Sequence, residues 1–480
     1  MKSYEQYVSK DDVKRIHENT LRILSEVGVK FESQRALEIF KNHDVKVEEN
    51  IVYIDKDTLE KCLLSTPKTF DMTVDYDGTQ QTLGNGAMLT CVIGHPAYIS
   101  KKGKIDLITS EDCIDQFKMS EASPIANSAN LNFAFLNKRK YTEEQRAMGQ
   151  IAFLLKYSNK YKVHCDPYVM GMHAEKAYDY STQGIKLMKR FFGRENDHIM
   201  FTIINPLSPL CFDEAPINKM LAYTEENQVC VISPCGMPLL TSPATVAGMM
   251  SETNAEILAG LVFIQLARPG TPVIYGNTSG ATDMRSIQLC IGTPETSLIS
   301  YATAALADFY DLPFRTGGAL SDAKDFDAQA GAESMMMMHT TYNVKPDFVL
   351  HHIGCMGSFN VVSLEKFVLD EEIAMMVKRQ LKGIDISEET LCFDEIKKVG
   401  PRGKYLNGRT PKIYRKEFYL SNLFNKEDPN NWQNSGSKSV FETANETVQK
   451  RIAQYQKPDL TKEQIAIVNP YLTDEFKAMF

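Results

Sequence analysis

The sequence lacks the marks of several protein classes. Its ten cysteines form no CxxC pair, and the two nearest, Cys230 and Cys235, have four residues between them. This excludes a disulfide scaffold and predicts reduced thiols. The longest apolar stretch, 257–267, is interrupted by Gly260 and Gln265 and is too short for a bilayer, which takes about 20 residues. The first residues contain no apolar signal segment, so we expect a cytoplasmic protein.

Excess positive charge is also missing. The chain has 53 Lys and Arg against 61 Asp and Glu, a net charge of −8, which argues against binding of nucleic acid or an anionic membrane by the whole molecule. The GxGxxG, GxxxxGK(S/T) and GxSxG motifs are absent, so neither a nucleotide-phosphate loop nor a hydrolase nucleophile elbow is predicted. With 43% apolar and 24% charged residues, the 480 residues are typical of a globular protein with a large core.

What is present is a repeating alternation of helix and strand patterns. Helical patterns over 174–191, 254–267, 295–310 and 328–342 separate short β-rich segments. The segments recur at roughly 30 to 43 residues, the length of one βα unit in a large barrel. We therefore predict an α/β fold, a (β/α)8 TIM barrel, although an open doubly wound sheet alternates in the same way. The seven segments are 130–135, 163–165, 199–204, 229–232, 272–275, 312–314 and 348–352, and 88–93 is the candidate for the eighth strand.

Three parts are predicted along the chain. Residues 1–125 form an N-terminal α+β cap, which includes a β-hairpin over 97–100 and 105–108. Residues 126–395 form the TIM barrel that carries the catalytic site, and residues 396–480 form a C-terminal helical extension. Within the extension, 397–416 holds eight Lys and Arg and no acid. This pattern is typical of a solvated face, but it is also able to dock an acidic partner.

The segments that follow the predicted strands are rich in Gly, Pro, Ser and Asn, whereas the connections from helix back to strand are plain. In a parallel barrel, the loops after the strands gather on one face, and that face carries the site. Two of these loops hold charged groups that are costly to bury alone. One holds Asp283 and Arg285, and the other runs from Arg315 through Asp322. Exposed ion pairs within each loop are the competing interpretation.

Histidine and cysteine residues near the strand ends also raise the possibility of a zinc site. No HxH, HxxxH or CxxC spacing supports it, so we favour packing roles for these residues. They are His164, Cys165, Cys235, His351, His352 and Cys355.

Several segments together resemble the trimethylamine methyltransferase family. They are IHENTLRILSEVGVKFES at 16–33, SPLCFDEAP at 208–216, SPATVAGMMSETNAEILAG at 242–260, the run from YGNTSGATDMRS to DAQAGAE at 275–333, and VVSLEKFVLDEEI at 361–373. The resemblance covers most of the chain. It implies a barrel that moves a methyl group from an amine to the cobalt of a corrinoid carried by a separate small protein.

One departure from the family pattern bears on the substrate. The trimethylamine branch carries pyrrolysine, and this sequence has only the twenty ordinary residues. It resembles the pyrrolysine-free branch, whose members demethylate quaternary amines: glycine betaine first, with proline betaine, carnitine and γ-butyrobetaine as further candidates. The corrinoid-binding signature, DxHxxG followed by SxL and GG, is not in this chain. The resemblance therefore implies a corrinoid (cobalamin) supplied by a partner protein, no tightly bound cofactor in this chain, and a homo-oligomer.

A quaternary ammonium has no N–H, so it is held by aromatic faces rather than by conventional hydrogen bonds. Six aromatic residues are candidates for such a cage, and we expect about half of them to be packing only: Tyr98, Phe133, Phe135, Tyr168, Phe212 and Phe359. A betaine carboxylate is best held by Arg, through a bidentate contact. The candidates to bind this carboxylate are Arg285, Arg315, His351 and His352, and Glu295 is a further candidate for substrate binding. The residues expected to shape the catalytic mouth are Ser321, Asp322, Lys324 and Gln329.

Two other functions stay open at this point. One is a zinc-dependent corrinoid methyltransferase that uses His164, Cys165, Cys235 or His352, which metal analysis would distinguish. The other is a non-catalytic betaine-binding protein, which would bind ligand without turnover.

Overall fold

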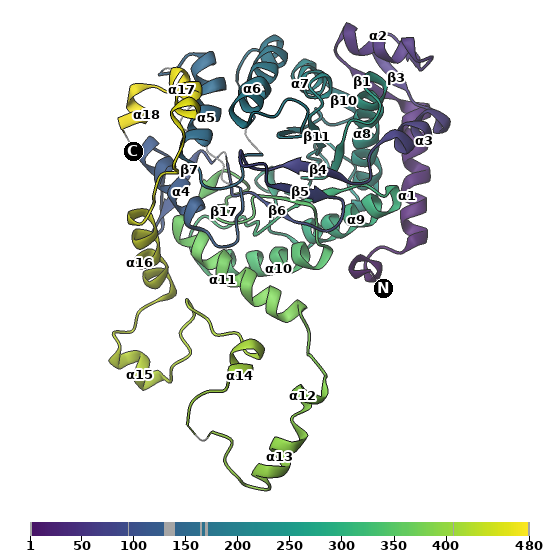
Figure 1. Cartoon of the computed structure of the whole chain (residues 1–480). Helices are drawn as coiled ribbons and strands as arrows, with labels where there is room; N and C mark the ends of the chain where they lie inside the picture. The colour runs from purple at the N-terminus through teal and green to yellow at the C-terminus, as the bar shows by residue number, and fades with distance from the viewer. Residues whose placement is uncertain are drawn as a thin grey trace.

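A computed structural model of the chain describes residues 2–94, 96–128, 140–163, 166–168, 171–406 and 408–478. At its centre lies a parallel sheet (Figure 1), in which each of the five pairs of neighbouring strands is parallel. Its strands, in spatial order, are β6 (Leu89–Thr90), β16 (Phe348–Leu350), β15 (Phe314–Gly317), β12 (Val273–Gly276), β11 (Val229–Ile232) and β9 (Phe201–Ile204).

Single backbone contacts join the two edges of this sheet. Cys91, just after β6, forms a parallel bridge with Ser128, and Ser128 forms another with Tyr161. The amide of Phe201 in β9 then donates to the carbonyl oxygen of Val163 (3.0 Å). The sheet thus closes, and the predicted TIM barrel is confirmed over the open alternative. The strand predicted at 88–93 is present as β6, whereas the one predicted at 130–135 lies outside the described residues.

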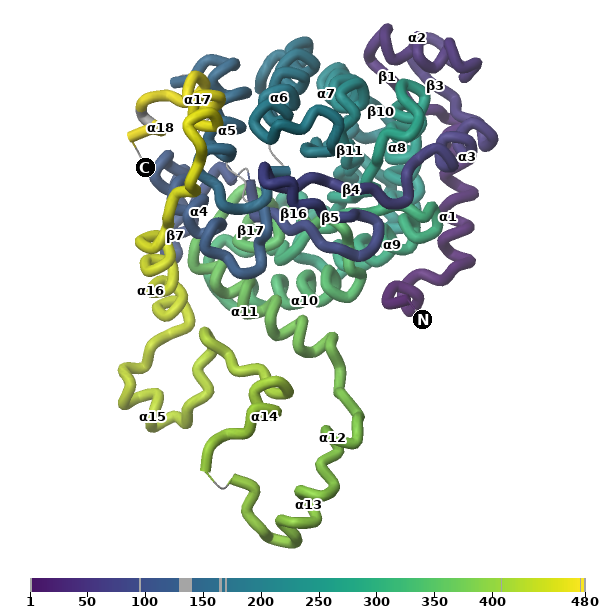
Figure 2. Tube along the Cα trace, viewed as in Figure 1, coloured from purple at the N-terminus to yellow at the C-terminus, as the bar shows by residue number. Residues whose placement is uncertain are grey.

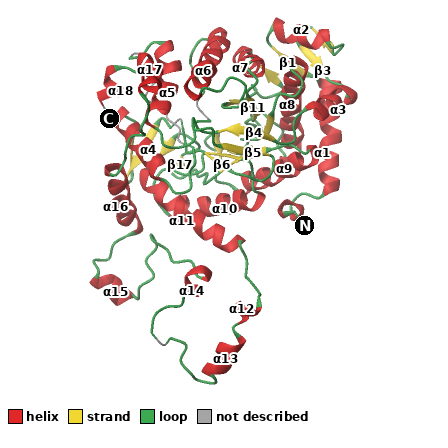
Figure 3. Ribbon diagram, viewed as in Figure 1, coloured by secondary structure: helices red, strands yellow, loops and turns green. Residues whose placement is uncertain are grey.

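Both faces of the barrel strands are buried, which explains their near-continuous apolar runs. Val231 and Ile274 pack in a cluster inside the barrel, and their neighbours Ile232 and Tyr275 pack outward among the helices. Figure 3 shows the helices surrounding the strands. They are α5 (Glu143–Tyr157), α6 (Ala177–Phe192), α7 (Glu214–Glu225), α8 (Val246–Ala267), α9 (Pro294–Tyr310), α10 (Ala328–Val344) and α11 (Leu364–Leu381).

The N-terminal region adds helices and a small sheet to one side of the barrel. Its elements are α1 (Lys10–Arg22), β1 (Val29–Phe31), α2 (Gln34–Asn42), β2 (Lys46–Glu48), β3 (Ile51–Tyr53) and α3 (Lys56–Ser65). β1 pairs with β10 (Cys211–Phe212), a strand that belongs to the loop after β9.

A hairpin of β4 (Phe70–Thr73) and β5 (Gln80–Leu83) covers the amino end of the barrel. The Thr73 amide donates to the carbonyl oxygen of His198 (2.8 Å), just before β9, and the Gly84 amide donates to Asp347 Oδ1 (2.6 Å), just before β16. Phe70 packs into the interior cluster. Because this end is covered, the site must be sought at the carboxyl end, as the loop composition predicts.

At the carboxyl end, a second sheet has the order β17 (Cys355–Met356), β18 (Val361–Val362), β7 (Tyr98–Lys101), β8 (Lys104–Leu107). The predicted β-hairpin is therefore confirmed as β7 and β8. The loop after β12 forms a further hairpin of β13 (Ala281–Asp283) and β14 (Gln288–Cys290).

After α11 the chain leaves the body in a wide loop and returns (Figures 1 and 2). This part holds α12 (Glu388–Leu391), α13 (Phe393–Val399), α14 (Lys412–Glu417) and α15 (Pro429–Asn434). It rejoins the body as α16 (Val440–Ala453), which packs on α11 and on α4 (Ser110–Ala122), and ends with α17 (Lys462–Val468) and α18 (Asp474–Ala478). Among the described residues, no helix has both the length and the apolar character needed to cross a membrane. The division at 125 and 395 stays a prediction.

Candidate functional site

Arg315 occupies the inside of the barrel. It lies in β15 in register with Gly276 and Phe348, and Phe348 belongs to the interior cluster. Its side chain crosses Gly276 so closely that a Cβ there would come within 2.8 Å of Arg315 Cγ. The Nη1 atom donates to the carbonyl oxygen of Asn277 (2.9 Å), to Thr278 Oγ1 (2.8 Å) and to Ser233 Oγ (3.2 Å). Side chains and backbone after β11 and β12 thus fix the guanidinium at the carboxyl end.

The charge of Arg315 has no acidic partner within the described part of the chain. The residue is 1% exposed, forms no ion pair there, and its Nε has no hydrogen-bond acceptor there. Burial lowers the pKa of Arg315 to about 10. A buried cation held only by neutral groups is costly, because its lost hydration is not replaced by an opposite charge. An anionic ligand would supply that charge.

On the strand that neighbours β15, the loop after β16 brings two rings together. His351 directly follows β16, and its ring centroid is 4.7 Å from that of Phe359. Phe359 ends a left-handed turn in which Gly357, Ser358 and Phe359 have φ values of 52°, 54° and 72°. Such angles cost about 1–2 kcal/mol for each residue with a side chain. Strain of this kind persists where surrounding contacts enforce it, often at functional sites.

Asp322 supplies one of those contacts. Its carboxylate accepts hydrogen bonds from Ser358 Oγ (2.7 Å) and from the amides of Ile291 and Gly292 (2.9 Å each). It therefore connects the loops that follow β12, β15 and β16. Asp322 thus anchors the turn that carries Phe359, and the Lys324 ammonium donates to the Asp322 carbonyl oxygen (2.6 Å).

A second carboxylate, Glu333 on α10, accepts hydrogen bonds from the same loop. The sequence analysis did not predict it. It accepts from Ser321 Oγ (2.8 Å), from the Asp322 amide (2.7 Å) and from Gln329 Nε2 (2.8 Å). All four residues predicted to shape the mouth thus fall into one network around Asp322 and Glu333. The sequence offers one signal for Glu333, which lies one helical turn after Gln329.

Other predicted substrate-binding residues lie away from Arg315. The Arg285 side chain is 91% exposed and pairs with Asp283 in the same hairpin (2.9 Å), while Glu295 is exposed in the first turn of α9. Tyr98 is exposed at the start of β7. The Tyr168 hydroxyl donates to the carbonyl oxygen of Met172 (3.1 Å). None of these side chains forms a hydrogen bond with Arg315 among the described contacts, so their roles stay predictions.

Two more candidates are deeply buried. Phe212 stacks on Phe31 in the core, with centroids 5.0 Å apart, as expected for a packing residue. His352 Nε2 lies 3.0 Å from the Tyr342 hydroxyl, and burial lowers the pKa of His352 to about 3. This histidine is therefore neutral at physiological pH and is poorly suited to binding a carboxylate. Phe133 and Phe135 lie outside the described residues.

The residues considered for zinc do not assemble in the described part of the chain. There, no three His, Cys, Asp or Glu side chains gather in an arrangement that could hold a metal ion. Cys235 Sγ contacts the carbonyl oxygen of Thr278 (3.6 Å), and burial raises the pKa of its thiol to about 11. His164 and Cys165 are outside the described residues.

Two carboxylates on α8 were also missed by the sequence analysis. Glu256 accepts from Ser208 Oγ (2.9 Å) and from the Leu210 amide (2.7 Å), both in the loop after β9. Burial raises the pKa of Glu256 to about 8 and that of Glu252, one turn earlier, to about 7. The sequence shows them only as two acids inside an apolar helix.

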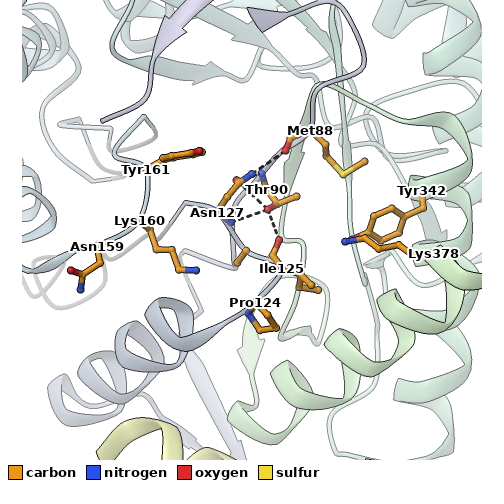
Figure 4. A pocket seen from close by; sticks show the side chains of 11 residues that line it. Met88, Thr90, Pro124, Ile125, Asn127, Asn159, Lys160, Tyr161, Tyr342 and Lys378 are labelled. Carbon is orange, nitrogen blue, oxygen red and sulfur yellow. Dashed lines mark hydrogen bonds between the residues drawn. The ribbon is translucent and has the colours of Figure 1, made fainter. Parts of the chain in front are cut away.

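A cavity of about 470 Å³ lies at the other end of the barrel (Figure 4). Its lining includes Met88, which precedes β6, Asn127, which precedes the bridge residue Ser128, and Tyr161, which forms the bridge with Ser128. Residues near the ends of α10 and α11 complete it. Asn127 Nδ2 donates to the carbonyl oxygen of Met88 (3.0 Å), and Lys160 Nζ donates to that of Ser123 (2.7 Å). Because its lining comes from residues at the start of the strands and from the last turns of α10 and α11, this cavity lies at the amino end of the barrel, and we do not assign it to the candidate site at the carboxyl end.

Comparison with known proteins agrees with this fold and identifies the family. The sequence profile of a family described as trimethylamine methyltransferase (MTTB) matches residues 2–475. The chain is 39% identical to a proline betaine:corrinoid methyltransferase of Eubacterium limosum, over 99% of this chain and 98% of that protein. It is 33% identical to an L-carnitine:corrinoid methyltransferase of the same organism (98% and 98%). It is 34% identical to a glycine betaine methyltransferase of Desulfitobacterium hafniense strain Y51 (98% and 97%).

In structure, the chain resembles MtmB, a monomethylamine methyltransferase of Methanosarcina barkeri. Its hydroxylamine complex superposes with a TM-score of 0.55 and 12% identity, over 94% of this chain and 89% of that one. At this identity, the likeness supports the barrel fold alone.

Proposed function

The chain belongs to the trimethylamine methyltransferase family, and we propose that it transfers a methyl group from a carboxylated quaternary amine to the corrinoid of a partner protein. The observation that carries this proposal is the buried guanidinium of Arg315, which has no acidic partner among the described residues. The names of the three relatives above refer to proline betaine, L-carnitine and glycine betaine, each of which combines a quaternary nitrogen with a carboxylate.

Arg315 is suited to the carboxylate of such a substrate. Its Nη1 is already occupied by Ser233, Asn277 and Thr278. The remaining edge, which includes the unpartnered Nε, is the side from which a guanidinium binds a carboxylate through two parallel hydrogen bonds. A betaine bound in this way would neutralise the buried charge and replace its lost hydration.

The cationic end of the substrate needs aromatic faces. Phe359 and His351 lie in the loop after β16, the strand that pairs with β15, and their ring centroids are 4.7 Å apart. Each ring face contributes roughly 0.5–2 kcal/mol to binding of a cation. Tyr98, Phe133, Phe135 and Tyr168 remain candidates for the rest of the cage.

In this reaction the protein orients the substrate and does not need to transfer a proton. The C–N bond of the methyl group breaks with its electron pair on nitrogen, so a neutral tertiary amine leaves and no general acid is required. The corrinoid supplies the nucleophile. The protein's part is to hold nitrogen and methyl in line with the acceptor. The covered amino end means that the partner approaches from the carboxyl end, where the loops around Asp322 lie.

Incubation of the protein with a quaternary amine and a carrier protein that holds cob(I)alamin tests the function. We expect methylcobalamin to form with glycine betaine first, and proline betaine, carnitine and γ-butyrobetaine complete the panel. Formation with none of them would refute the proposal. Binding without transfer would indicate a betaine-binding protein, and stoichiometric zinc in active protein would indicate the zinc-dependent alternative.

A further inference from the structure

Residues 384–416, which we call the arm, extend away from the barrel (Figures 1 and 2). They include α12 and α13 and run into α14. Arg379 on α11 closes the neck of the arm, because its Nη1 donates to the carbonyl oxygen of Gly383 (2.8 Å) and its Nε to that of Glu417 (2.6 Å). Beyond the neck the chain packs on the body again, where Leu423 is buried in the core. The arm is thus a defined excursion whose two ends meet at the body.

The arm exposes large apolar side chains that its own barrel does not cover. Phe393 is 68% exposed and Leu406 is 72% exposed. Single exposed apolar residues are normal on a protein surface, but a concentration of them in one short segment marks an interaction site. The exposed large apolar residues of the arm are Ile384, Ile386, Leu391, Phe393, Ile396, Tyr405, Leu406 and Tyr414.

The charges of the arm are divided into two blocks of opposite sign. Residues 384–396 contain five Asp and Glu and no Lys or Arg, whereas 397–416 contain eight Lys and Arg and no acid. None of the five acids forms an ion pair with any residue that the structure describes. The acidic block is therefore open to an external partner.

From these observations we infer that the arm binds the arm of a second copy of this chain, with the acidic block of each copy along the basic block of the other. A two-fold axis brings identical segments together in opposite directions, so each block meets its complement. A partner of one sign, such as an acidic protein, would match the basic block and be repelled by the acidic one. The exposed apolar residues would be buried between the two arms.

Two charge-reversal variants test this pairing in the full-length chain. Variant A carries Asp385→Lys, Glu389→Lys and Asp394→Lys, and variant B carries Arg402→Glu, Arg409→Glu and Lys412→Glu. All six side chains are exposed. The assembly mass is measured by sedimentation equilibrium for the wild type, for each variant and for an equimolar mixture of A and B. A matched control reverses three exposed lysines outside the arm, Lys41, Lys61 and Lys176.

We expect each variant to show half the assembly mass of the wild type, because like charges then face each other. Mixing A with B restores opposite charges at both contacts, so the mixture should regain the wild-type mass, and the control should keep it. A further variant, in which a short Gly-Ser linker joins Gly383 to Glu417, should also show half the mass. A monomeric wild type, unchanged mass in A and B, or a mixture that fails to recover would each overturn the inference.

Discussion

The carboxyl end of the barrel and the arm both hold charged side chains that form no ion pair among the described residues, Arg315 in the barrel and the five acids in the arm, but they do so under opposite conditions. Arg315 is 1% exposed, so its charge has little water around it, whereas the charged side chains of the arm used in variants A and B are exposed and hydrated. An unpaired charge costs free energy inside the barrel, where it has lost its water, but costs almost nothing on the exposed arm. In our proposals, the buried charge of the barrel is therefore matched by a small anion, whereas the exposed charges of the arm are matched by the opposite charges of a second arm.

The largest effect should come from removing the buried charge. Arg315→Met leaves a substrate carboxylate without its partner, and truncating one side of a buried charged pair costs about 2–5 kcal/mol. We therefore expect kcat/KM for glycine betaine to fall by about 30- to 5,000-fold, measured as methylcobalamin formed on a carrier protein.

Arg285→Met is the matched control, because Arg285 has the same charge and was predicted for the same role but lies exposed beside Asp283. Its kcat/KM should stay within about twofold of the wild type, as expected for a surface ion pair. Equal losses in both variants would show that burial does not distinguish the two arginines.

The next effect concerns the turn that presents Phe359. Asp322→Ala leaves the amides of Ile291 and Gly292 and the hydroxyl of Ser358 without their acceptor, which costs roughly 2–4 kcal/mol of stability. Because the turn loses its anchor, we also expect kcat/KM to fall by about tenfold. Circular dichroism at rising temperature and the methyl-transfer assay measure the two effects.

Asp325→Ala serves as the control for this prediction. Asp325 lies in the same loop but accepts from the Gly103 amide (2.9 Å), at the turn of the β7–β8 hairpin. It should leave kcat/KM within about twofold of the wild type. Unaltered catalysis in a folded Asp322→Ala variant would remove the positioning role.

Loss of apolar side chains from the arm should have a smaller effect than loss of Arg315 or Asp322 in the barrel. Phe393→Ser combined with Leu406→Ser removes two exposed apolar side chains without any change of charge. We expect the dissociation constant between copies to rise by about tenfold or more, seen by sedimentation, while kcat for methyl transfer is unchanged. If the variant associates as tightly as the wild type, these apolar side chains do not contribute and the two arms are held together by charge alone.

The smallest effect is a change in pH dependence. Burial raises the pKa of Glu256 from 4.5 to about 8, so its ionisation is disfavoured in the folded state. The free energy of unfolding therefore falls as pH rises from 4.5 through 8, and Glu256→Gln should lack that fall. We expect the melting temperature of the variant to exceed that of the wild type by about 2 °C or more at pH 9 and to match it at pH 5. Identical melting temperatures of the variant and the wild type at pH 9 would contradict the raised pKa of Glu256.

The sequence was sufficient for the fold because the barrel is encoded in local patterns. Apolar runs such as 229–232 and 272–275 predict buried strands wherever they recur, and β11 and β12 lie there. The loops after the strands were predicted as the site for the same reason. The one-sided richness in Gly, Ser and Asn follows from the direction of a parallel barrel.

The individual site residues were harder to predict because their roles depend on distant partners. Arg285 and Arg315 are the same residue type in the sequence, and only the pairing of Arg315 with Gly276 shows that Arg315 is the one inside the barrel. Phe212 follows β9, as a mouth residue would, but pairing of its strand with β1 places it against Phe31. Contacts of this kind join segments far apart in the chain, which no local pattern reveals.

The central claim, that Arg315 binds a substrate carboxylate, is tested most directly by calorimetric titration with two ligands. One is the betaine that stabilises the wild-type protein most in a thermal-shift panel, and the other is its methyl ester, which keeps the cation and loses the negative charge. We predict that the ester binds the wild type at least about 30-fold more weakly than the betaine, and that Arg315→Met binds the two equally. An ester that binds the wild type as tightly as the betaine, or a variant that still distinguishes them, would contradict the account.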